Sequence, residues 1–98
     1  MTPEDLDEQV EEAFFGKTGR NPPRPFSTEL EFASKLLEKL HKEGWFWRLD
    51  SVPSGVICTV QCLTPKGDPK NPERITYQVG AATIALAICE AALKTKKP

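Results

Sequence analysis

The run ATIALAICEAALK, residues 82–94, constrains the fold of this chain more than any other stretch. It has the composition of a helix, yet Glu90 and Lys94 are its only charged residues. At 100° per residue the larger apolar side chains fall on two faces, the first with Ile84 and Ile88 and the second with Leu86, Cys89 and Leu93. A helix of this kind is buried on more than one side, so it needs two partners.

Three predicted strands supply the first partner. Residues 45–49 are aromatic and can alternate, residues 56–63 follow a turn, and residues 74–79 alternate between apolar and polar side chains. In the middle strand Val56, Cys58, Val60 and Cys62 share one face. An antiparallel three-stranded sheet with one apolar face needs a cover, which two helices provide.

A second long helix is predicted ahead of the strands. Thr28 and Glu31 form a capping box at its start, and Gly44 is placed to end it. Its apolar residues recur at intervals of three and four: Leu30, Ala33, Leu36, Leu37 and Leu40. This helix and residues 82–94 should therefore pack side by side on the sheet.

The chain of 98 residues, 39% of them apolar, has material for one modest core. We predict a single α+β domain over residues 1–98, in which residues 27–98 form an α-β-β-β-α core with a three-stranded antiparallel sheet and two long helices. Residues 3–16 form a short N-terminal helix, and residues 17–26 form a Pro-rich linker.

Charge and cysteine content exclude several classes of protein. With Lys plus Arg at 13 and Asp plus Glu at 14, the chain has no overall field that favours nucleic acid or an anionic membrane. The α-β-β-β-α order also matches double-stranded RNA-binding domains, but residues 80–84 lack the lysines that hold phosphates there. We therefore expect neither a nucleic-acid nor a membrane partner.

The three thiols, Cys58, Cys62 and Cys89, show no Cys-x-x-Cys spacing, and His41 is the only histidine. Buried, reduced thiols and no metal site are expected. No nucleophile with a base and no paired carboxylates are visible, so we expect no catalytic residues, no cofactor and no enzymatic activity. The acidic N-terminus and the absence of an apolar run of about 18 residues favour a cytoplasmic location.

Three segments resemble a known family. The runs LDEQVEEAFFGK, PPRPFSTELEFASKLLEKLHKEGW and ATIALAICEAALK, in this order, are similar to small bacteriophage proteins of the phage ABA sandwich domain. The family has a longer, aromatic-rich segment where this chain has only TGRNPPR. The resemblance implies a helix and sheet sandwich of phage or prophage origin, acting in the cytoplasm of an infected bacterial host. It also implies an accessory or counter-defence role, of which sequestering a nucleotide immune signal is one form.

Binding of a small anionic ligand is the first functional hypothesis. The sheet face opposite the core would present two arginines among hydrogen-bonding groups, and residues 80–83 would add amides at a helix N-terminus. The candidate ligand-binding residues are Arg24, Arg48, Gln61, Arg74, Thr76, Gln78 and Thr83. Two alternatives remain open, namely that this face is only solvated or that the first helix covers it through Leu6, Val10 and Phe14.

Protein interaction is the second hypothesis. The second face of the last helix, with Leu86, Cys89 and Leu93, could meet another subunit and form a homo-oligomer. The same face, or an unpaired edge of the sheet, could dock on and inhibit a host defence protein.

Overall fold

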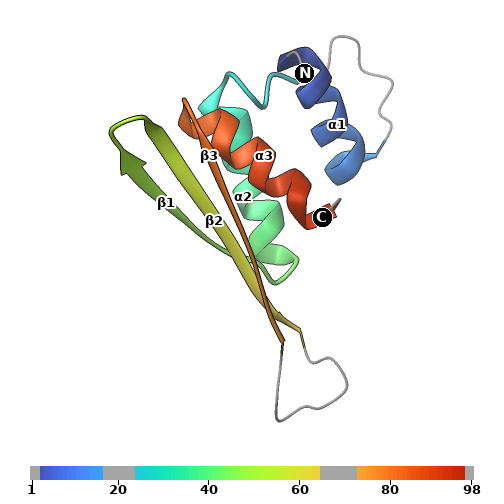
Figure 1. Ribbon diagram of the computed structural model, residues 1–98. Helices are drawn as coiled ribbons and strands as arrows, with labels where there is room; N and C mark the ends of the chain where they lie inside the picture. The colour runs from blue at the N-terminus through green and yellow to red at the C-terminus, as the bar shows by residue number, and fades with distance from the viewer. Residues whose placement is uncertain (1–2, 17–23, 65–72, 97–98) are drawn as a thin grey trace.

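The computed structural model describes residues 3–16, 24–64 and 73–96 of the chain. Along these ranges the elements are α1 (Pro3–Phe15), α2 (Leu30–Lys42), β1 (Phe46–Val52), β2 (Gly55–Thr64), β3 (Glu73–Ala81) and α3 (Ile84–Lys96). The predicted α+β architecture and the order of its elements are confirmed (Figure 1).

The sheet is an antiparallel meander in the order β1-β2-β3. Phe46 pairs with Gln61 and Val52 with Gly55, so that β1 continues three residues beyond the predicted strand. Gly55 begins β2 with a φ of +149°, and a Cβ atom there would lie 2.2 Å from the carbonyl oxygen of Ala81. Only glycine fits where the β1–β2 turn approaches the end of β3 this closely.

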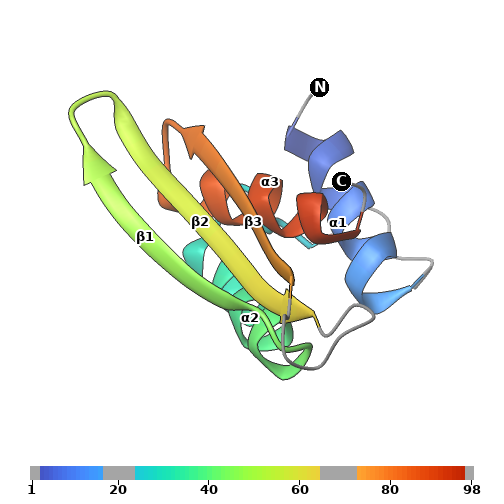
Figure 2. The same ribbon diagram turned by 60° about the horizontal axis from the view of Figure 1, so that its bottom comes forward.

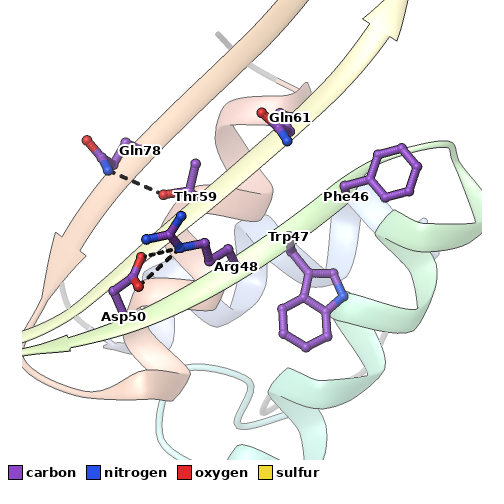
Figure 3. Close-up of a pocket in the computed structure, with 7 residues that line it drawn as sticks. All are labelled: Phe46, Trp47, Arg48, Asp50, Thr59, Gln61 and Gln78. Atoms are coloured by element: carbon purple, nitrogen blue, oxygen red, sulfur yellow. Dashed lines mark hydrogen bonds and ion pairs between the residues drawn. The ribbon is translucent and has the colours of Figure 1, made fainter.

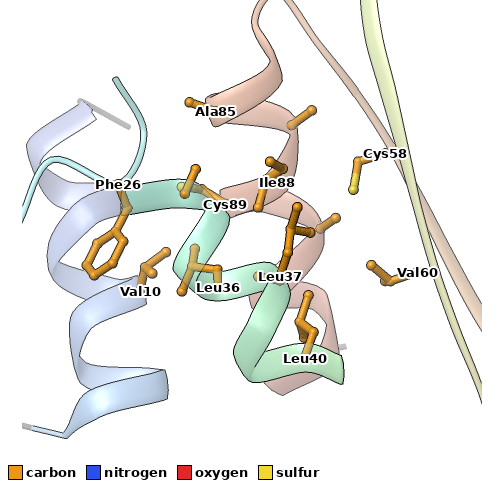
Figure 4. Close-up of a cluster of buried hydrophobic side chains, with 14 of the residues drawn as sticks. Val10, Phe26, Leu36, Leu37, Leu40, Cys58, Val60, Ala85, Ile88 and Cys89 are labelled. Carbon is orange, nitrogen blue, oxygen red and sulfur yellow. The ribbon is translucent and has the colours of Figure 1, made fainter. Parts of the chain in front are cut away.

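All three helices lie on one side of the sheet, which we call its inner side. α2 and α3 pack directly on the sheet, and α1 packs on α3 as a third layer beyond them (Figures 1 and 2). The predicted core face of β2 is confirmed, because Cys58, Val60 and Cys62 are buried and Val56 is half-buried. Cys58 and Val60 lie in one buried cluster with the leucines of α2 and Ile88 of α3 (Figure 4).

The position of α1 explains why α3 has two apolar faces. Leu6, Val10 and Phe14 are buried in the same cluster as Cys89, whose side chain has no exposed surface. The second face of α3 is thus covered by α1 within one chain. The alternative in which α1 covers the opposite face of the sheet is wrong.

The start of α2 also differs from its prediction. The helix begins at Leu30, its N-cap is Glu29 without a side-chain hydrogen bond, and the Thr28–Glu31 capping box is not formed. Instead the carbonyl of Pro25 accepts hydrogen bonds from the amides of Thr28 and Glu29 in a tight turn. The helix thus begins one residue later than predicted. Leu30 is 52% exposed and does not lie in the core, contrary to the prediction.

The predicted end of α2 is confirmed. Gly44 has a φ of +92°, and its amide donates to the carbonyl of His41 while the amide of Trp45 donates to that of Leu40. This pair of bonds is a Schellman motif, which needs a left-handed residue and so favours glycine. The motif turns the chain directly from α2 into β1.

Candidate functional site

The side of the sheet away from the helices, here called the outer face, carries most of the predicted ligand-binding residues. Side chains alternate along each strand, so the register brings those of neighbouring strands into rows across this face. One row contains Arg48, Thr59 and Gln78, and the next contains Phe46, Gln61 and Thr76. The described helices leave both rows uncovered, because each of them lies on the inner side.

A shallow hollow of about 220 Å³ lies on the outer face near β1 (Figure 3). It is lined by Phe46, Trp47, Arg48, Asp50, Thr59, Gln61 and Gln78. The Nε atom of Arg48 lies 3.1 and 2.9 Å from the two carboxylate oxygens of Asp50, and Gln78 Nε2 donates to Thr59 Oγ1 at 3.3 Å. The hollow therefore holds one ion pair and carries no net charge.

Three of the predicted residues, Arg48, Gln61 and Gln78, are brought together around this hollow. Thr76 lies beside Gln61 on the same face, and Arg74 lies further along β3, opposite Leu63 of β2. Both are exposed, but neither lines the hollow. The outer face thus gathers five of the seven predicted residues, with two cations separated along the sheet.

Arg24 lies elsewhere and already has a partner. Its Nε atom is 2.9 and 3.1 Å from the carboxylate oxygens of Glu11, and its guanidinium lies 4.3 Å from the centre of the Phe15 ring. The Glu11 side chain is only 6% exposed. Arg24 therefore connects α1 to the segment before α2, and it is not among the residues that line the outer-face hollow.

Thr83, another predicted ligand-binding residue, also lies apart from the outer-face hollow. The hydroxyl of Thr83 accepts a hydrogen bond from the amide of Leu86 at 3.2 Å, which makes it the N-cap of α3. It borders a separate, largely apolar hollow of about 460 Å³ between the N-terminal ends of α2 and α3, beside the exposed Leu30 and Ile84. This hollow is not continuous with the residues that line the outer-face hollow.

The three residues of the predicted oligomer interface differ in their exposure. Cys89 is inaccessible, so its assignment to an interface is wrong, whereas Leu86 and Leu93 are half-buried at the margins of the core. Four residues of the hollow are outside the predicted ligand-binding set: Phe46, Trp47, Asp50 and Thr59. Asp50 was assigned to a turn, although its spacing of two from Arg48 is the signal of a shared strand face.

The thiols have the environment of structural residues. Burial raises the pKa of Cys58 to about 11, and burial with the nearby charges of Asp7 and Glu90 raises that of Cys89 to about 12. Both thiols therefore stay protonated at neutral pH, and the thiolate is the nucleophilic form. Within the described ranges, no group of three or more His, Cys, Asp or Glu residues is arranged to hold a metal ion.

No helix in the described part of the chain is both long enough and apolar enough to cross a membrane. Comparisons with protein-family models, with curated proteins and with solved structures found no match to this chain. The outer face and its hollow are therefore the features of the molecule that bear on its function.

Proposed function

We propose that this chain is a non-catalytic binding protein that docks a partner protein on the outer face of its sheet. The observation that carries the proposal is the exposed hollow whose lining includes Phe46, Arg48 and Gln61, on a face that none of the described helices covers. Aromatic and arginine side chains dominate the binding energy of protein interfaces. Amides beside them suit hydrogen bonding to a partner's backbone.

The geometry favours a protein over a nucleotide in this hollow. Small-molecule sites are usually enclosed volumes of about 300 to 1,000 Å³. This hollow has about 220 Å³, and the Asp50 carboxylate offsets the positive charge of Arg48. A phosphate group there would lie beside a carboxylate, which repels it. We therefore place protein docking ahead of nucleotide sequestration.

The proposed biological setting rests on the resemblance of three segments to the phage ABA sandwich domain. That resemblance implies an accessory or counter-defence role during infection. The proposed partner is accordingly a host defence protein in the bacterial cytoplasm, which the chain would inhibit by occupying a functional surface. Buried thiols with raised pKa values support a role without covalent catalysis.

A matched pair of variants tests the docking surface. Gln61→Arg places a bulky cation on the outer face, and Ser34→Arg places the same side chain at an exposed position of α2. Immobilised wild-type protein and both variants are incubated with the lysate of a bacterium that expresses defence proteins against phage. The bound proteins are then quantified by mass spectrometry. We expect one host protein to bind the wild type and Ser34→Arg equally and to bind Gln61→Arg at least about tenfold less.

Reconstitution with the purified partner then gives the dissociation constant by calorimetry. Equal binding by Gln61→Arg and Ser34→Arg would show that the partner uses another surface. A thermal-shift panel of nucleotides is run in parallel. A nucleotide that raises the melting temperature of the wild type but not of Arg48→Ala would establish sequestration and contradict protein docking.

A further inference from the structure

The outer edge of β1 is one of the two unpaired edges of the described sheet. β1 pairs with β2 on one side only, so its other edge presents backbone amides and carbonyls. Natural sheets usually protect such edges with proline, lysine or a bulge. The seven residues of β1 contain no proline or lysine, and their pairing with β2 runs from Phe46–Gln61 to Val52–Gly55 without a bulge.

The same strand carries exposed aromatic side chains on both faces of the sheet. Phe46 is 60% exposed on the outer face, and Trp47, which alternates to the inner side, is 44% exposed (Figure 3). Among the described residues these are two of the four large apolar side chains with this degree of exposure. A strand lying alongside β1 would contact both rings.

The charges of β1 identify which strand fits there. Arg48 and Asp50 lie on the same face, on either side of Leu49. When β1 pairs antiparallel with a second copy of itself around Leu49, Arg48 lies opposite the partner's Asp50, and Asp50 opposite the partner's Arg48. In the same register, Phe46 meets the partner's Val52, which is a favourable aromatic and β-branched pair.

We propose that the protein forms a two-fold symmetric dimer by antiparallel pairing of β1 with β1 of a second copy, centred on Leu49. The two three-stranded sheets would then form one continuous sheet, with about six to eight new backbone hydrogen bonds. Paired positions share a face, so both outer faces would lie on the same side. This dimer goes beyond the proposed docking function and shares Phe46 and Arg48 with the hollow. The two proposals are tested separately, because the docking variant, Gln61→Arg, lies on β2 and not on the β1 edge.

The other edge of the sheet lacks this self-complementarity. The charged residues Glu73 and Arg74 are adjacent at one end of β3. An antiparallel pairing of β3 with itself around Tyr77 would place Arg74 opposite the partner's Gly80. It would therefore join no opposite charges, and β1 is the edge that selects a second copy of this chain.

The ion pairs would mainly set the register of the dimer. Arg48 and Asp50 already contact each other within one chain, and both are partly exposed. Exposed ion pairs contribute little affinity, but like charges directly opposite each other on neighbouring strands are unfavourable. Reversing one charge therefore disrupts the pairing by placing like charges opposite each other, and a compensating reversal in the partner removes that repulsion.

Complementary charge reversals test the dimer. Arg48→Asp gives a strand with two carboxylates, Asp50→Arg gives a strand with two guanidinium groups, and Arg74→Asp is a matched reversal on β3. Sedimentation velocity over a concentration series should show a dimer for the wild type and for Arg74→Asp. Each β1 variant alone should dimerise at least about tenfold more weakly.

Mixing the two β1 variants distinguishes this register from an effect within one chain. In the mixed pair every carboxylate lies opposite a guanidinium, so the heterodimer should form with about the wild-type affinity. Circular dichroism checks that each variant is folded. Hydrogen exchange of the wild type needs no variant, and β1 amides should exchange more slowly above the dissociation constant than below it.

Three results would overturn the proposal. The first is a wild-type protein that stays monomeric up to about 1 mM. The second is a dimer that the β1 reversals leave unchanged, since it would use another surface. The third is a mixture of the two variants that stays monomeric.

Discussion

At the scale of single residues, the structure shows how strongly one contact can restrict the choice of side chain. Gly55 combines a φ of +149° with an approach to Ala81 that leaves no room for a Cβ atom. Gly80, on the neighbouring strand, has open space around the position of a Cβ atom. The two glycines therefore differ in what they contribute, although both lie at the same end of the sheet.

We predict that Gly55→Ala lowers the free energy of unfolding by about 1 to 3 kcal/mol, because the new methyl group forces the backbone away from Ala81. Gly80→Ala should change it by less than about 1 kcal/mol. Urea unfolding followed by circular dichroism measures both. Equal effects of the two substitutions would contradict this account of the β1–β2 turn.

At the scale of elements, the attachment of α1 determines what the rest of the chain exposes. α1 lies against α3 through Leu6, Val10 and Phe14, and the amide of Ser27 donates to the Asp7 carboxylate at 2.7 Å. Arg24 adds its ion pair with Glu11. Without α1, the face of α3 around Cys89 would be open to water, whereas Cys58 would stay between the sheet and the two inner helices.

Thiol labelling tests this layering. Val10→Asp places a carboxylate at a fully buried position and should loosen α1, because burying an unpaired charge is costly. We expect maleimide to label Cys89 at least about tenfold faster than in the wild type, with Cys58 unchanged. Glu8→Asp, which has the same side chain at an exposed position of α1, is the control. Labelling of both thiols at one rate would instead show that the three layers unfold together.

At the scale of the whole molecule, the buried thiols link stability to pH. Their pKa values, about 11 for Cys58 and about 12 for Cys89, exceed the ordinary value of 9.0. The unfolded chain loses these protons first as the pH rises, so the folded state keeps its full advantage below pH 9.0 and loses it between 9.0 and about 12.

We therefore predict that the free energy of unfolding falls as the pH rises above 9.0, by up to about 1.4 kcal/mol per pH unit for each thiol. Urea unfolding at pH 8, 9, 10 and 11 measures the slope. The variant Cys89→Ala removes one of the two thiols, so the slope of unfolding free energy against pH should be smaller in it than in the wild type. The slopes are compared, and not the free energies themselves, because the substitution also changes packing. An unchanged slope would assign the pH dependence to other groups.

Much of the sheet and of its inner face could be predicted, because alternation along a strand is a local property. Val56, Cys58, Val60 and Cys62 are on the predicted side, and Gly44 ends α2 as expected. The candidate site was predictable only in part. Arg48, Gln61 and Gln78 share a face through local alternation, whereas the pairing of Arg24 with Glu11 depends on how the chain folds back.

The amino-acid sequence by itself determined the element types, the two apolar faces of α3 and the side of each strand that enters the core, since periodicity acts over a few residues. Only the tertiary structure decided that α1 covers the second face of α3, that Arg24 pairs with Glu11, and that none of the described helices covers the outer face of the sheet. These outcomes depend on contacts between segments far apart in the chain. No local pattern specifies which of several apolar surfaces will meet.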